Sequence, residues 1–132
     1  YYYRFKNADV KDWLWKSESI LELYVFLQER KKNAGCCVGV YLDWDGIIQP
    51  QPGLDVFNEI DVLTLQDNVL TFISCKSGKL AGNQALHAMY ELETVAERFG
   101  GNYARKVLAI AYPLSEAYRN RASEMGIEIR QV

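Results

Sequence analysis

Two adjacent strand patterns joined by Asp67 and Asn68 constrain the fold of this 132-residue chain more than any other feature. Residues 56–65 and 69–76 are rich in β-branched and aliphatic residues, and only a short polar stretch separates them. Asp and Asn tolerate positive φ better than most residues, which favours a two-residue turn. We therefore expect an antiparallel hairpin within the sheet.

The length of this turn decides which side chains of the two strands share a face. With a two-residue loop, Asp61 lies opposite Ser74 and Glu59 lies opposite Lys76. A three-residue loop would place the two polar pairs on opposite faces. We prefer the two-residue turn, because it gathers two carboxylates, a hydroxyl and an ammonium group in one place.

The remaining elements follow from hydrophobic periodicity and from start and stop signals. Strand patterns occupy residues 37–44, 104–112 and 127–132, and helical patterns occupy residues 17–32, residues 81–99 and a short stretch between Pro113 and Gly126 that Ser115 caps. A proline- and glycine-rich loop, GIIQPQPG, follows the first strand. The order αβββαβαβ predicts an α/β domain with a mixed central sheet flanked by helices.

Composition narrows the class of protein. The chain is 49% hydrophobic, which is enough for one domain core without disulfides or a structural metal, and three cysteines in apolar strands suit reduced thiols. A formal net charge of -2 excludes a strongly basic nucleic-acid coat, so any nucleic-acid contact would be local. Without a membrane span or signal pattern, we expect a soluble, cytoplasmic protein.

The first residues, YYYRFK, have no methionine and read as the continuation of something upstream. We expect residues 1–16 to form a seam or linker from a missing domain. Residues 17–132 would then form the folded domain.

The polar groups of the hairpin allow two interpretations. They could form a cross-strand ion pair at the end of the sheet, worth a few tenths of a kcal/mol. Alternatively, the carboxylates could hold a divalent cation while the lysine steadies an attacking water or a developing negative charge.

These residues resemble a known motif. NEIDVL at residues 58–63, followed after the hairpin by FISCK at residues 72–76, is similar to the PD-(D/E)xK motif of restriction-endonuclease-like nucleases. More narrowly, LELYVF, NEIDVL, FISCKSGK and AERFGG resemble the nuclease half of CARF-linked effector nucleases of type III CRISPR systems. The resemblance extends over residues 18–129. It implies a restriction-endonuclease-like αβββαβ core with an additional C-terminal αβ unit.

The resemblance also implies roles for individual residues. Asp61 would be the central metal ligand, Glu22 the acid of the first helix that completes the site, and Glu59 a neighbouring acid. The backbone carbonyl of Cys75 would provide a further ligand to Mg²⁺ or Mn²⁺. Lys76 would be the catalytic lysine of a metal-dependent endonuclease.

The sequence departs from the motif at one position, because Ser74 stands where the pattern has an acid two residues before the lysine. A hydroxyl is a much poorer ligand for a hard cation than a carboxylate. Two alternatives to a CARF-linked nuclease therefore stay open. One is a catalytically silent module that binds nucleic acid or mediates dimerisation, and the other is a stand-alone junction or repair nuclease.

Residues after the lysine are candidates for contacts with nucleic acid. Gln84 and His87 open the second long helix, where a helix N-terminus can meet a phosphate, and Lys79 follows a glycine at the edge of the sheet. We expect Gln84 and Lys79 to bind DNA or RNA, and regard His87 as the weaker candidate. The resemblance further implies a homodimer and an upstream CARF domain that binds cyclic oligoadenylate.

Overall fold

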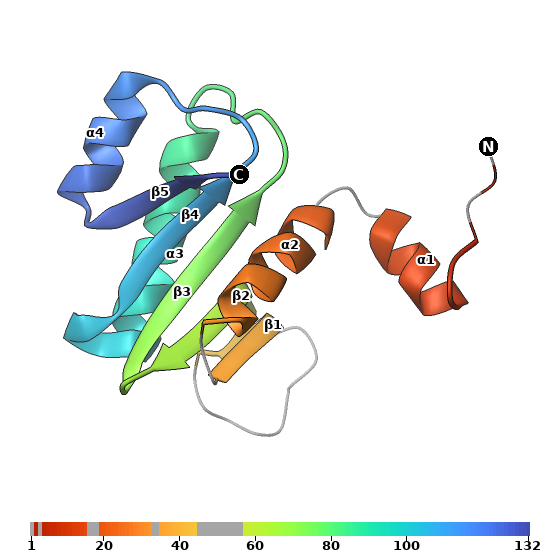
Figure 1. Cartoon of the computed structure of the whole chain (residues 1–132). Coiled ribbons are helices and arrows are strands. Elements are labelled where there is room, and N and C mark those ends of the chain that lie inside the picture. The colour runs from red at the N-terminus through yellow and green to blue at the C-terminus, as the bar shows by residue number, and fades with distance from the viewer. Residues whose placement is uncertain (1, 3, 16–18, 33–34, 45–56) are drawn as a thin grey trace.

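The computed structural model describes residue 2 and residues 4–15, 19–32, 35–44 and 57–132 (Figure 1). Its elements, in chain order, are α1 (Ala8–Trp15), α2 (Ser19–Arg30), β1 (Gly35–Asp43), β2 (Phe57–Gln66), β3 (Val69–Lys76), α3 (Gln84–Gly100), a 3-10 turn (Gly101–Tyr103), β4 (Arg105–Ile110), α4 (Glu116–Glu124) and β5 (Ile127–Gln131). From α2 onward, the helices and strands follow the predicted order αβββαβαβ.

The helix α1 lies in the segment that we expected to be a seam or linker. Asn7 caps it, because its Oδ1 accepts the backbone N–H of Val10 at 2.8 Å. The helix buries none of its residues and is set apart from the sheet in Figure 1. The expected domain boundary after residue 16 and the predicted loop at residues 46–53 lie outside the described residues.

The sheet has the strand order β1-β2-β3-β4-β5. The first three strands are antiparallel neighbours, whereas β3, β4 and β5 run parallel. Parallel neighbours need crossover connections, which α3 and α4 provide (Figure 1). The predicted mixed sheet is confirmed.

The hairpin between β2 and β3 has the predicted two-residue turn. Asp67 and Asn68 have φ values of 52° and 63°, and Gln66 pairs with Val69 across the turn. Positive φ at both central residues is typical of the type I′ turn, whose twist matches that of the flanking strands.

Helices cover both faces of the sheet. On one face, Leu21 and Val25 of α2 form a core with strand residues that include Ile73. On the other face, Met89 of α3 and Ala122 of α4 belong to a second core, which is built on the alternate strand side chains. The fold is therefore a three-layer α/β arrangement in which the hairpin β2–β3 runs between α2 and α3.

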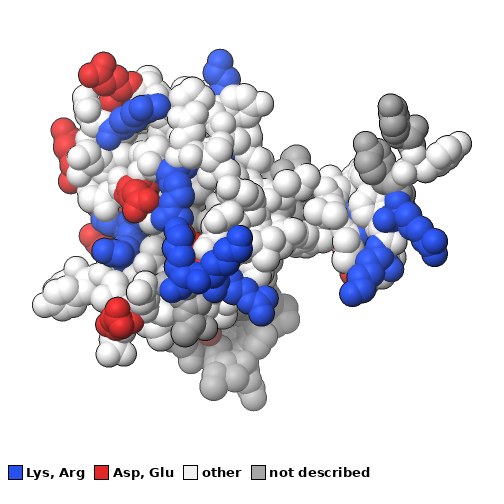
Figure 2. Space-filling view, in the orientation of Figure 1, with Lys and Arg blue, Asp and Glu red and all other residues white. Residues whose placement is uncertain are grey.

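Charge is unevenly distributed over this small surface. Figure 2 shows Lys and Arg side chains grouped in the middle of one face, with Asp and Glu side chains nearer the side that carries α4. A net charge of -2 therefore coexists with a local cationic area. Of the helices in the described ranges, none is both long and apolar enough to cross a membrane.

Candidate active site

Strand β2 bends at Asp61. Ile60 packs in the core on the α3 side, whereas Val62 packs in the core on the α2 side, although residues two apart in a regular strand share a face. The ladder between β2 and β3 also ends just before this point, at the pair Val62 and Ile73. Gly39, which lies opposite Asp61 in β1, has a φ of +60° that suits glycine and lets β1 follow the bend. The two strands of the hairpin thus separate at the residue that the sequence singled out.

The carboxylate of Asp61 bridges the gap between the separating strands. Its Oδ2 accepts the backbone N–H of Cys75 at 2.5 Å and lies 3.4 Å from the hydroxyl of Ser74, which donates to it. Burial raises the pKa of Asp61 above its usual range, while the Cys75 N–H and the nearby charge of Lys76 act in the opposite direction. Asp61 is thus a partly desolvated carboxylate in a fixed position.

Four of the sequence-predicted residues line one cleft of about 40 Å³ at this separation: Glu59, Asp61, Ser74 and Lys76. The opposite wall comes from α3 and includes Glu91 and Leu92. A space of this size has room for one or a few groups as large as water. The expectation that the hairpin would gather carboxylates, a hydroxyl and an ammonium is therefore met by the geometry.

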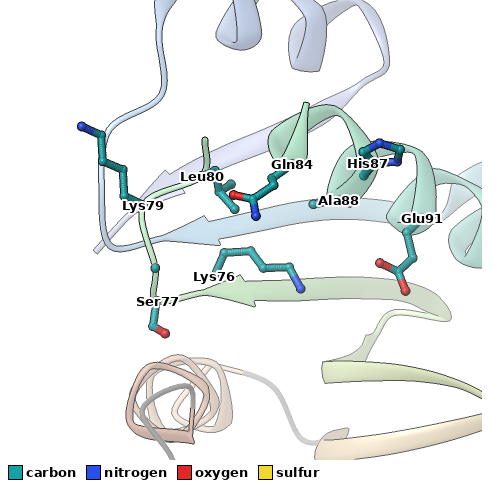
Figure 3. A pocket seen from close by; sticks show the side chains of 9 residues that line it. Lys76, Ser77, Lys79, Leu80, Gln84, His87, Ala88 and Glu91 are labelled. Atoms are coloured by element: carbon teal, nitrogen blue, oxygen red, sulfur yellow. The ribbon is translucent and has the colours of Figure 1, made fainter. Parts of the chain in front are cut away.

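A larger cavity of about 400 Å³ adjoins this cleft and shares Lys76 and Glu91 with it. It lies between the end of β3 and the start of α3 (Figure 3), and Lys79, Gln84 and His87 also line it. In Figure 3, the ammonium of Lys76 lies between β3 and α3, whereas the side chain of Lys79 extends away from it.

Gln84 holds the loop before α3 in place. Its Oε1 accepts the backbone N–H of Ala81 at 2.8 Å, so its amide nitrogen is left on the side of the cavity, toward Lys76 (Figure 3). The same loop is anchored to α4, because the hydroxyl of Tyr118 donates to the carbonyl of Gly82 at 2.6 Å. The amide nitrogen of Gln84 is therefore a hydrogen-bond donor held in a defined position in the cavity wall.

Glu22 lies apart from the cleft. It is half-buried on α2, the helix that covers the opposite face of the sheet, and it does not line the cleft. It is nevertheless near the end of β3, because its charge helps to raise the pKa of the buried Cys75 thiol, after burial itself and the charge of Asp61. The structure thus brings Glu22 to the same stretch of β3 from the other side.

The backbone of Cys75 also faces the separation. Its N–H points toward β2, where it meets Asp61. The N–H and C=O of one strand residue point toward the same neighbouring strand, so the carbonyl of Cys75 faces the same gap.

Sequence reasoning did not assign Glu91 to the site. Gln84, His87 and Glu91 are spaced i, i+3, i+7, which places them on one face of α3. This spacing could have pointed to Glu91, since a helix face that presents Gln84 and His87 to the site also presents the residue four positions after His87.

The donors of the cleft fit a hard divalent cation. They are carboxylate and hydroxyl oxygens, with a backbone carbonyl beside them, and Mg²⁺ in proteins is held by one or two carboxylates together with several waters. Within the described ranges, no three or more His, Cys, Asp or Glu side chains converge as a ready-made metal cluster. The cleft therefore suits a partly hydrated ion better than a fully protein-ligated one.

Solved structures with the same fold are found, although neither a family model nor a curated protein matches the sequence. Can2 from Sulfobacillus thermosulfidooxidans, solved with cyclic tetra-adenylate, superposes with a TM-score of 0.71 at 21% identity, over 96% of this chain and 35% of that protein. Protein VC1899 from Vibrio cholerae superposes with a TM-score of 0.67 at 21% identity, over 96% of this chain and 33% of that protein. A repair endonuclease from Pyrococcus abyssi superposes with a TM-score of 0.54 at 14% identity, over 99% of this chain and 49% of that protein.

The chain thus spans about a third of the length of the first two of these proteins. Identities of this size establish the fold alone. The architecture of a mixed sheet between helices, its strand order and these superpositions agree with the resemblance seen in the sequence. The chain has the restriction-endonuclease-like fold.

Proposed function

We propose that this chain is a metal-dependent nuclease domain that hydrolyses phosphodiester bonds in DNA or RNA. The observation that carries the proposal is the cleft where β2 and β3 separate, because it places Asp61 and Lys76 together at the mouth of a cavity large enough for a nucleotide phosphate. The similarity in fold to a repair endonuclease supports the same class of reaction.

In this proposal, Asp61 holds Mg²⁺ or Mn²⁺, with Glu59 and the carbonyl of Cys75 as further oxygen ligands. A bound divalent cation supplies an activated water and neutralises charge on the phosphate. The raised pKa of Asp61 suits such a ligand, since a partly desolvated carboxylate gains more from a nearby cation than a solvated one does. We keep Glu22 as a further acid of the site, approaching the same part of β3 from α2.

Lys76 is the residue we propose to act on the phosphate. Its backbone is fixed at the end of β3, where its carbonyl accepts the N–H of Ala111 at 3.1 Å, while its side chain extends into the cleft. An ammonium group there can hold the attacking water or stabilise the charge that develops on the phosphate oxygens.

The larger cavity is the proposed contact with the nucleic acid. The start of α3 borders it, and the partial positive charge of a helix N-terminus favours a phosphate. The amide nitrogen of Gln84 can donate to a phosphate oxygen, and Lys79 can meet the backbone further along. His87 lines the same wall and is the weaker candidate.

The direct test is cleavage of single-stranded and duplex DNA and RNA in Mn²⁺, in Mg²⁺ and in EDTA. We expect cleavage that EDTA stops and that Asp61→Asn lowers by about 10²-fold or more. The variant is a close control, because an asparagine oxygen can still accept the Cys75 N–H. If the wild-type protein binds nucleic acid but cleaves none of these substrates in either metal, the chain is the silent module of the same fold.

The silent module is favoured by one observation, the serine at position 74, which leaves the cleft without the motif acid. Calorimetry separates the two functions. A nuclease site should bind Mn²⁺ in a manner that Asp61→Asn abolishes, whereas a binding or dimerisation module needs no cation.

We also propose that the domain is the effector half of a CARF-linked cytoplasmic protein that acts as a homodimer. The support is the sequence resemblance together with the fold shared with Can2, which was solved with cyclic tetra-adenylate. The test compares cleavage by the natural full-length protein with and without cyclic tetra-adenylate, and light scattering for the oligomeric state. A stand-alone junction or repair nuclease would cleave equally under both conditions.

A further inference from the structure

We propose that Glu91 of α3 supplies the carboxylate that Ser74 lacks, so that the acid of the motif is provided from the helix instead of the strand. The inference rests on the proposed metal-dependent nuclease function. It assigns a metal-site role to a residue on the opposite wall of the cleft from the hairpin.

The position of Glu91 is fixed by its helix. Its neighbours on α3 that face the sheet, Ala88, Leu92 and Val95, are all buried in the core, with exposures of 6%, 1% and 2%. Glu91 lines both the small cleft, with Asp61 and Ser74, and the larger cavity, with Lys76 and Gln84. The packing of α3 thus holds this carboxylate at the junction of the two spaces.

The side chains on the two walls are oriented toward each other. In Figure 3, the carboxylate of Glu91 and the ammonium of Lys76 extend toward the same space between β3 and α3. Among the described residues, no ion pair within 4.0 Å joins them. The two charged groups therefore do not pair directly, and both border the cleft and the larger cavity of about 400 Å³.

Charge explains why this residue would be needed. The hydroxyl of Ser74 is neutral and already donates to Asp61, so it adds no negative charge to the cleft. Mg²⁺ and Mn²⁺ are held better by two carboxylates than by one, and they retain waters that a more distant carboxylate can bind. Glu91, across the cleft from Ser74, adds a carboxylate from the opposite wall to those of Asp61 and Glu59, directly or through a coordinated water.

The first measurement is Mn²⁺ binding by calorimetry, compared between the wild type, Glu91→Gln, Asp61→Asn and Glu97→Gln. Glu97 is the matched control, because it is an exposed glutamate on the same helix that does not line the cleft. We expect Glu91→Gln to weaken Mn²⁺ binding by about 10-fold, as loss of a carboxylate that supports a metal does, and Glu97→Gln to bind as the wild type does. The melting temperature of the metal-free protein should be unchanged in both variants, since both side chains are exposed.

The second measurement is rescue. Ser74→Glu, introduced into the Glu91→Gln variant, returns a carboxylate to the strand position and should restore Mn²⁺ affinity and the Mn²⁺ dependence of cleavage. Wild-type affinity in Glu91→Gln, or an unrescued double variant, would overturn the inference. If Asp61→Asn abolishes Mn²⁺ binding while Glu91→Gln has no effect, the proposed function stands and the role of Glu91 fails. If the wild-type protein binds no Mn²⁺, both fail.

Discussion

At the scale of single residues, a variant of Lys76 distinguishes a catalytic role of this lysine from a structural one. Lys76→Ala should leave the fold intact, because the backbone of the residue keeps its place in β3 while only its side chain enters the cleft. If the ammonium acts in the transition state, turnover should fall by about 10²-fold or more. Single-turnover cleavage assays measure this, with Lys31→Ala as the control, because Lys31 is exposed and lines neither the cleft nor the larger cavity. A Lys76→Ala protein as active as the wild type would exclude the role.

Asp61 should cost the metal-free protein some stability. Burial raises the pKa of Asp61 above its ordinary value, so the ionised carboxylate is less favourable in the folded chain than in the unfolded one. The contribution of this group to stability is therefore present below the unfolded pKa and is lost as the pH rises through the folded one. Asparagine carries no charge and can still accept the Cys75 N–H.

We accordingly expect Asp61→Asn to raise the melting temperature of the metal-free protein at pH 7 by about 2–4 °C. The difference from the wild type should narrow toward about pH 3, where the carboxyl is mostly protonated in both states, because its ordinary pKa is 3.8 and its folded pKa is higher. Thermal unfolding in EDTA at both pH values measures the effect. A variant that melts below the wild type at pH 7 would show that the ionised carboxylate stabilises the fold.

At the scale of elements, the turn between β2 and β3 determines the geometry of the site. Asn68 has a φ of 63°, a conformation that glycine adopts freely and a β-branched residue does not. We expect Asn68→Gly to be tolerated and Asn68→Val to lower the free energy of unfolding by about 1–2 kcal/mol. Urea unfolding of the two variants provides the comparison, and equal stabilities would contradict the strained turn.

Local patterns were sufficient to predict most elements. The β3 limits and the turn at Asp67 and Asn68 agree with the structure, because turn chemistry and alternation are properties of neighbouring residues. The bend at Asp61 was not predicted, since it depends on how β2 meets two cores at once. The helix α1 was also missed, because it is short and buries nothing that would leave a periodic pattern.

The candidate site was predictable to the same extent. Asp61, Ser74 and Lys76 come together because strand register follows from the turn, and the register was accessible from sequence. The place of Glu91 in the site could not be predicted from the sequence, because it depends on how α3 packs over β3. Glu22 belongs to a helix whose face of the sheet could not be assigned from the sequence, and its role as a ligand stays a prediction.

At the scale of the whole molecule, an ion pair joins α2, the first helix packed on the sheet, to β5, the last strand. Glu29 of α2 is 6% exposed, and its Oε1 accepts a hydrogen bond from Nη1 of Arg130 in β5 at 2.6 Å, across 101 residues of sequence. Lys32 lies further from the same oxygen, at 3.7 Å. The pair therefore ties α2 to the far edge of the sheet, and so helps to hold the helix that carries Glu22.

Removing Arg130 takes the closer of these two cations from the buried carboxylate of Glu29 and leaves the more exposed Lys32 at 3.7 Å. Weakening the compensation of a buried charge is more costly than losing an exposed pair. Because Arg130 itself is about one-third exposed, we expect Arg130→Met to lower the free energy of unfolding by about 2 kcal/mol, below the range for fully buried pairs. Adding Glu29→Leu to this variant removes the buried charge and should recover part of the loss. Chemical denaturation of the single and double variants measures both steps. If the double variant is less stable than Arg130→Met alone, Glu29 stabilises α2 through contacts other than this ion pair.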